Sequence, residues 1–147
     1  MHILMCNDDG ILADGLRRLA SYLSQYYRIT VVAPANEQSA KSHALTTEIP
    51  LKLDAYNGED ENPRLYALTG TPSDCMKFGL SYLLTDDMPD LVISGINHGF
   101  NLGSDVLYSG TVSAAMESCF YGIPGLALSV ERYSPERGDE MHPFIHE

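Results

Sequence analysis

Short apolar runs alternate along this chain with segments whose apolar residues recur at helical spacing, and this alternation constrains the fold most. The apolar runs, each of a length typical of a strand, are residues 3–6, 28–33, 65–68, 90–94 and 126–130. Helical spacing is found in three segments between them, residues 16–23, 71–84 and 111–120. Consecutive strands joined through helices lie parallel, and a parallel sheet is buried by helices on both of its faces. The sequence therefore predicts an α/β protein with three layers and a mainly parallel sheet.

Local signals set several boundaries of these elements. Residues 71–74 read Thr-Pro-Ser-Asp, which predicts an N-cap, a proline in the first turn and a carboxylate facing the free amides of a helix that runs to about Leu84. Residues 46–53 alternate weakly and contain a proline, so we expect an edge or irregular strand there. Residues 35–44 are polar and residues 95–110 are rich in glycine, which is typical of long loops.

Composition limits the partners of the protein. The chain has 147 residues and a net charge of −11, whereas nucleic-acid polymers and anionic membranes require clustered lysine and arginine. No apolar run approaches the length of a membrane span, and the first residues lack the basic start of a secretory signal. The three cysteines are scattered without a C-x-x-C motif, which favours reduced thiols. We expect a cytoplasmic protein with neither a membrane nor a nucleic-acid polymer as its main partner.

The acidic pair Asp8-Asp9 directly follows the first apolar run. Adjacent carboxylates at the end of a strand repel each other, and a divalent cation would relieve that repulsion. Ser39 and Asn97 follow two other predicted strands, and ligands of open α/β sheets lie beyond the carboxyl ends of the strands. Two carboxylates, a hydroxyl and an amide oxygen suit Mg²⁺ or Mn²⁺. Taken alone, the acidic pair is equally compatible with a helix-capping aspartate beside a solvated one.

A second group of candidate residues surrounds the start of the third predicted helix. Ser109, Gly110 and Thr111 place small hydroxyl residues and a glycine at a helix N-terminus, where free amides and the helix dipole favour an anion. The alternative is that Ser109 or Thr111 only caps the helix. His43, in the loop after the second strand, is a candidate for donating a proton to a leaving group or binding phosphate, although loop histidines are often merely solvated.

Five stretches of the sequence resemble the survival protein SurE family. They are NDDGILADGLRRL, VVAPANEQSAKSHALT, TGTPSDC, PDLVISGINHGFNLGSDVLYSGTVSAAMES and GIPGLALS. They occur in the order and spacing of the family and cover most of residues 1–130. The resemblance implies a SurE-like, Rossmann-like core and a metal-dependent phosphatase acting on nucleoside monophosphates, a 5′/3′-nucleotidase. It also implies one divalent metal ion, Mg²⁺ or Mn²⁺, per subunit.

The resemblance assigns roles to individual residues. The implied metal ligands are Asp8, Asp9, Ser39 and Asn97, of which Asp8, Asp9 and Asn97 are also catalytic. The implied substrate- and phosphate-binding residues are Ser42, His43, Asn101, Ser109, Gly110 and Thr111. The family also implies a homodimer or tetramer and a longer C-terminal part. We therefore expect a core with the metal and phosphate site in residues 1–130, and in residues 131–147 a polar tail that begins a truncated C-terminal region; a frayed terminus is the alternative.

These residues favour hydrolysis of a phosphomonoester by a metal-activated water, and a covalent aspartyl-phosphate route stays open. One alternative is a catalytically impaired fragment that still binds metal and nucleotide. A less favoured alternative is a phospho-receiver signalling domain, which also starts with a strand ending in an acidic pair. A receiver would carry an aspartate where this chain has Ser94-Gly95, and a lysine beyond Lys77, after which this chain has none.

Overall fold

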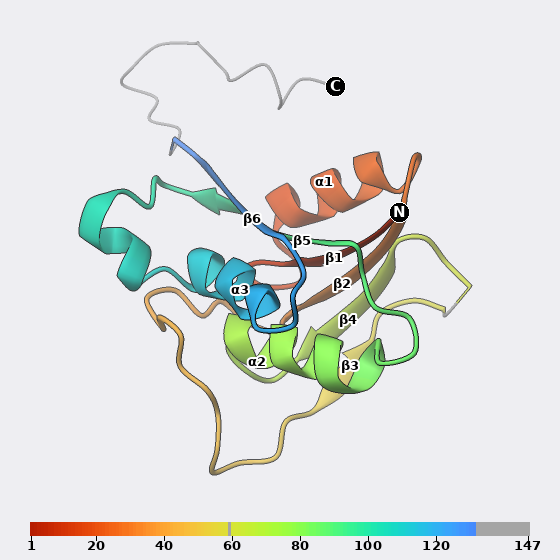
Figure 1. The fold of residues 1–147 in the computed structure, drawn as a ribbon, viewed down its shortest axis with the longest axis horizontal. Helices are drawn as coiled ribbons and strands as arrows, with labels where there is room; N and C mark the ends of the chain where they lie inside the picture. The colour runs from red at the N-terminus through yellow and green to blue at the C-terminus, as the bar shows by residue number, and fades with distance from the viewer. Residues whose placement is uncertain (59, 132–147) are drawn as a thin grey trace.

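The computed structural model describes residues 1–58 and 60–131 of the chain (Figure 1). The strands of these residues form one six-stranded sheet in the order β3-β4-β2-β1-β5-β6, in which only β3 runs antiparallel to its neighbour. The elements in chain order are β1 (His2–Cys6), α1 (Asp14–Leu23), β2 (Arg28–Pro34), β3 (Leu53–Ala55), β4 (Arg64–Leu68), α2 (Pro72–Phe78), the π-helical turn η1 (Gly79–Leu83), β5 (Leu91–His98), the 3₁₀ turn η2 (Gly103–Leu107), α3 (Gly110–Cys119) and β6 (Gly125–Val130).

Helices cover both faces of this sheet, with α1 on one face and α2 and α3 on the other (Figure 1). Strand β1 lies in the middle, and alternate side chains along it enter two separate apolar clusters. Ile3 and Met5 pack with Leu16 of α1, whereas Leu4 packs with Leu80 of η1 on the opposite face. A strand buried on both faces has a continuous apolar sequence, as β1 does. The predicted three-layer α/β fold with a mainly parallel sheet is confirmed.

Helix α2 begins where the sequence predicts. The Thr71 hydroxyl accepts a hydrogen bond from the Asp74 amide at 3.1 Å, and the Asp74 carboxylate accepts one from the Thr71 amide at 2.9 Å. This reciprocal pair is a capping box with Pro72 in the first turn. The helix continues through η1 to Leu83, close to the predicted end at Leu84.

The strand predicted over residues 46–53 is wrong except at its end. Only Leu53–Ala55 pairs, antiparallel to β4. Thr46 is bonded instead to the Asp74 carboxylate, through its amide at 2.9 Å and its hydroxyl at 2.6 Å. Pro50 has no amide proton for a sheet ladder. The segment therefore crosses the surface as a loop tied to α2.

Strand β5 is longer than predicted. The sequence suggested a loop from Gly95, but pairing with β6 continues to His98 after a register shift between Ser94 and Asn97. Gly95 has φ +127°, and a Cβ there would lie 2.4 Å from the Leu128 carbonyl oxygen. The glycine thus permits the close approach of β6 rather than ending the strand.

The predictions about the tail and about membrane spans can be compared only with the residues that the structure describes. The polar tail predicted over residues 131–147 lies outside them, apart from Glu131. In the part of the chain that the structure describes, no helix is both long enough and apolar enough to cross a membrane.

His2, at the start of β1, makes folding stability dependent on pH. It is 3% exposed; its Nε2 lies 2.9 Å from the Thr30 hydroxyl and its Nδ1 lies 3.2 Å from the Asp87 carbonyl oxygen. Burial lowers the pKa of His2 below its ordinary value of 6.5; nearby Arg28 lowers it further, and Asp87 partly opposes the shift. Below pH 6.5 the unfolded chain therefore binds more protons at this position than the folded chain, so the stability contribution is lost as the pH falls.

We expect the melting temperature of the wild-type protein to fall by a few degrees more between pH 7 and pH 5 than that of His2→Gln. Thermal melts of both proteins across this range measure the difference. Parallel curves for the two proteins would show that His2 does not carry this proton uptake.

Candidate active site

A turn after β1 holds the acidic pair at the carboxyl edge of the sheet. The Asn7 side chain, fully buried, accepts a hydrogen bond from the Gly10 amide and donates one to the Gly10 carbonyl, each at 3.1 Å. These two bonds close the turn around Asp8 and Asp9. Asn7, for which the sequence predicted no role, is the residue that shapes this turn.

Asp8 contacts the start of α3, although more than one hundred residues separate them in sequence. Asp8 is 5% exposed, and its Oδ1 accepts a hydrogen bond from the Thr111 hydroxyl at 2.6 Å. A Cβ on Gly110 would lie 2.9 Å from the Asp8 Cβ and 3.1 Å from the Pro72 Cγ. The structure therefore brings together Asp8, Gly110 and Thr111. Position 110 has room only for glycine, because the acidic turn and the start of α2 lie so close to it.

Ser109 has the capping role that the sequence analysis kept as an alternative. Its hydroxyl accepts a hydrogen bond from the Val112 amide at 3.1 Å, and its side chain is buried. The Thr111 hydroxyl does not cap the helix but donates to Asp8. The first amides of α3 remain the groups of this helix suited to an anion.

The loop of residues 35–46 starts beside the acidic turn. The Gln38 amide donates to the Asp8 carbonyl oxygen at 2.8 Å. Ser39, the next residue, is exposed and donates from its hydroxyl to the Glu37 carboxylate at 2.7 Å. Both lone pairs of the Ser39 oxygen are left as acceptors for a cation.

Asn97 lies on β5 and Asn101 follows this strand. The side-chain amide of each residue donates a hydrogen bond. The Asn97 side-chain amide donates to the Gly99 carbonyl at 2.8 Å, so its Oδ1 is the atom available as a ligand. Asn97 pairs with Ser129 of the neighbouring strand β6, and the side-chain amide of Asn101 donates a hydrogen bond to the Ser129 hydroxyl at 2.9 Å. Strands β1 and β5 are neighbours, so Asn97 and the acidic pair lie beyond the same edge.

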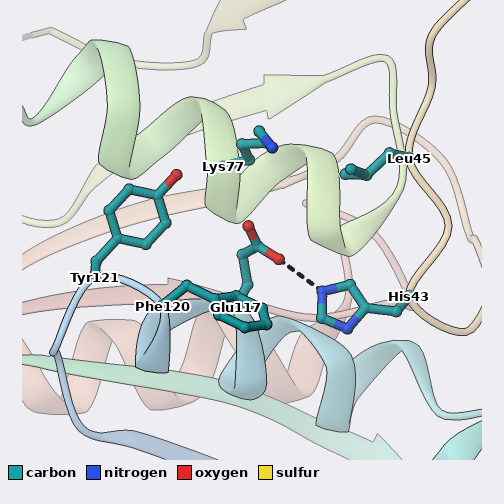
Figure 2. A pocket seen from close by; sticks show the side chains of 6 residues that line it. All are labelled: His43, Leu45, Lys77, Glu117, Phe120 and Tyr121. Carbon is teal, nitrogen blue, oxygen red and sulfur yellow. Dashed lines mark hydrogen bonds and ion pairs between the residues drawn. The ribbon is translucent and has the colours of Figure 1, made fainter.

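Ser42 and His43 connect the loop to α3 and to the residues just before it. The Ser42 hydroxyl donates to the Leu107 carbonyl at 2.7 Å, and the Ser42 amide donates to the Tyr108 carbonyl at 3.2 Å. The His43 Nε2 lies 2.6 Å from Oε2 of Glu117 on α3 (Figure 2). A hollow of about 450 Å³ adjoins this pair and is lined by His43, Leu45, Lys77, Glu117, Phe120 and Tyr121.

Glu117 was missed by the sequence analysis. Its signal lies in the buried face of α3, where Gly110, Ser113, Ala114 and Glu117 follow helical spacing. A carboxylate at a buried position needs a partner, and a search for one would have led to the loop histidine.

The residues at this edge fit a hard divalent cation. The predicted ligands offer two carboxylates, one hydroxyl and one amide oxygen, with neither nitrogen nor sulfur among them. Among residues 1–58 and 60–131, no group of three or more histidine, cysteine, aspartate or glutamate side chains could hold a metal ion. A metal bound here would thus depend on the neutral oxygens of Ser39 and Asn97 in addition to the acidic pair.

Comparison with known proteins identifies the family. Residues 3–146 match the family model described as survival protein SurE. The chain belongs to the SurE family. A solved SurE protein from Aquifex aeolicus is 43% identical, with a TM-score of 0.77, over 88% of this chain and 50% of its own.

Curated SurE relatives extend the match to nearly the whole chain. The 5′-nucleotidase SurE of Thermoanaerobacter sp. (strain X514) is 54% identical over 99% of this chain and 57% of its own length. The 5′-nucleotidase SurE of Thermosipho africanus (strain TCF52B) is 52% identical over 99% of this chain and 56% of its own length. The chain thus spans little more than half the length of these relatives.

Proposed function

We propose that this chain carries the active site of a metal-dependent phosphatase that hydrolyses nucleoside monophosphates to nucleoside and phosphate. The observation that carries the proposal is the 2.6 Å hydrogen bond between the Thr111 hydroxyl and Asp8, which joins a carboxylate turn to a helix N-terminus. Groups suited to a cation and groups suited to an anion thereby adjoin. Relatives named 5′-nucleotidase SurE support nucleoside monophosphates as the substrate class.

Asp8, Asp9, Ser39 and Asn97 would hold one divalent cation, Mg²⁺ or Mn²⁺. Such a cation, when bound, polarises the phosphoryl group and lowers the pKa of a bound water. Thr111 fixes the orientation of the Asp8 carboxylate through its hydroxyl, which leaves the second Asp8 oxygen for the metal. The Asn97 side chain is oriented in the same way by its bond to Gly99.

The chain's other residues bind the substrate and move the proton. The first amides of α3, at Gly110 and Thr111, donate to the phosphoryl oxygens and stabilise the charge that develops on them. Asn101 and the loop residues Ser42 and His43 complete the phosphate side of the site. Asp9 accepts the proton of the attacking water or orients that water for attack on phosphorus.

We place this site in a core of residues 1–130, and a homodimer or tetramer stays a prediction from the family. The phospho-receiver alternative is not favoured, because the family model and the curated relatives that match the chain are SurE proteins. A binder of metal and nucleotide that lacks activity is the alternative that an assay must separate.

Phosphate release from 5′- and 3′-nucleoside monophosphates, before and after metal chelation, tests the proposal. We expect chelation to lower the rate by about 100-fold or more, and Mn²⁺ or Mg²⁺ to restore it, because the cation contributes several kcal/mol of transition-state stabilisation. Mn²⁺ and nucleotide should also raise the melting temperature. Activity that survives chelation would contradict the proposal, and ligand-induced stabilisation without phosphate release would favour the inactive binder.

A further inference from the structure

Glu117 is a buried acid outside the ligand set, and it is bonded to His43 in the loop that also carries the predicted site residues Ser39 and Ser42. The Glu117 side chain is 7% exposed, and its Oε2 lies 2.6 Å from Nε2 of His43. A carboxylate this deeply buried is costly unless its charge is compensated by a close hydrogen bond. Figure 2 shows the two side chains pointing toward each other at the hollow that both of them line.

The loop that His43 belongs to requires anchors. Ala40 and Ser42, on either side of Lys41, have φ values of 58° and 53°, a left-handed conformation that residues with a Cβ rarely adopt. Such conformations persist only where the surrounding structure holds them. Ser39, a predicted metal ligand, is adjacent to this strained stretch, so its position depends on how firmly the stretch is held.

Most anchors of the loop are hydrogen bonds that involve its main chain. The Ser42 amide donates to Tyr108, and the Ala44 carbonyl accepts from the Thr71 hydroxyl at 2.6 Å. The bond from His43 to Glu117 is a side-chain anchor of the same loop. It reaches α3, the helix whose first residues contact Asp8.

We propose that Glu117 is a positioning residue of the SurE site. By accepting the Nε2 proton of His43, it holds residues 39–43 against α3 and so places Ser39 and Ser42 relative to Asp8 and the helix start. The carboxylate can only accept, which assigns the Nε2–H tautomer to a neutral His43. The catalytic consequences rest on the proposed function, whereas the anchoring of the loop does not.

Tryptic cleavage after Lys41 tests the anchoring without reference to activity. Lys41 is exposed and lies between the two left-handed residues. Because cleavage of a native protein follows the population of the opened segment, we expect the rate at this bond to rise about tenfold in Glu117→Ala. Glu117→Gln should stay within about threefold of wild type, because its amide oxygen accepts the same proton.

Three further variants test this result. His43→Asn removes the same anchor from the loop side and should raise cleavage by about tenfold as well. Because it leaves the buried Glu117 carboxylate without this hydrogen bond, we also expect a lower melting temperature, and cleavage is measured well below it. The double variant should add little to either single one, because both remove the same bond. Lys77→Met changes a charged neighbour in the same hollow outside this pair, and should cleave as the wild type does.

The position of Ser39 gives a second readout. In Glu117→Ala we expect the Kd for Mn²⁺ and the KM for nucleotide to rise about 5- to 10-fold, with kcat within about threefold, because only the fraction of molecules with residues 39–43 held against α3 falls. Glu117→Gln should restore both constants. A role confined to stability would lower the melting temperature of both Glu117 variants and leave these constants unchanged, which would overturn the proposal.

Unchanged cleavage at Lys41 in both Glu117→Ala and His43→Asn would also overturn it. If the wild-type protein released no phosphate, the proposed function would fail. The cleavage rates would still decide the role of Glu117.

Discussion

Asp8→Asn and Asp9→Asn are each expected to lower kcat/KM for nucleoside monophosphates by about 1,000-fold or more. Each substitution removes one of the two charges that would hold the cation, and Asp9→Asn also removes the group that receives the proton of water. Phosphate release at saturating Mn²⁺ measures the loss. Asp14→Asn, at the exposed start of α1, makes the same change of charge and should keep nearly full activity.

The effect on stability separates this loss from a loss of folding. Asp8 is buried beside a second carboxylate, and asparagine keeps an oxygen that accepts from the Thr111 hydroxyl. We therefore expect metal-free Asp8→Asn to melt no lower than the wild type. Mn²⁺ should raise the melting temperature of the wild type and not that of the variant. Full activity in either asparagine variant would remove the acidic pair from the mechanism.

Gly110→Ala is expected to cost about 100-fold in kcat/KM and about 1–3 kcal/mol in stability. The new methyl group would lie 2.9 Å from the Asp8 Cβ, 3.1 Å from the Pro72 Cγ and 3.3 Å from the Asp8 Oδ2. Because all three atoms belong to well-packed elements, the start of α3 must shift away from the acidic turn. Steady-state kinetics and thermal melts measure the two effects.

Gly58→Ala is the matched control for that substitution. The nearest atom to a Cβ at Gly58 is 3.9 Å away, at the end of the exposed Glu61 side chain. We expect wild-type kinetics and a melting temperature within about 2 °C of the wild type. If Gly110→Ala were as active as this control, close packing of α3 on Asp8 would not matter for catalysis.

Elements whose signals are local could be predicted from the sequence. Strand β1 is a continuous apolar run, and α2 begins with a capping box encoded within residues 71–74. The strand predicted over residues 46–53 does not form because Thr46 is bonded to Asp74, a partner 28 residues away. Strand β5 passes Gly95 because β6 approaches at that residue, and a glycine in isolation reads as a loop signal.

The edge of the sheet at which the candidate site residues lie could be predicted from the sequence, but the hydrogen bonds that they make could not. Residues beyond the carboxyl ends of parallel strands converge at one edge, so Asp8 and Asn97 could be placed from the order of elements alone. The partners of these side chains could not be placed in that way. The bond from Thr111 to Asp8, and the pairing of His43 with Glu117, 74 residues away in sequence, depend on how helices pack on the sheet.

The separation of 103 positions between Asp8 and Thr111 also sets an order of events during synthesis. At typical translation rates of about 5–20 residues per second, the acidic turn leaves the ribosome roughly 5–20 s before the helix that completes it. Until then the Asp8 carboxylate lacks the hydrogen bond from the Thr111 hydroxyl. A nascent chain therefore has the first two ligands of the proposed metal site before it has the groups suited to phosphate, and those groups are added only when α3 docks.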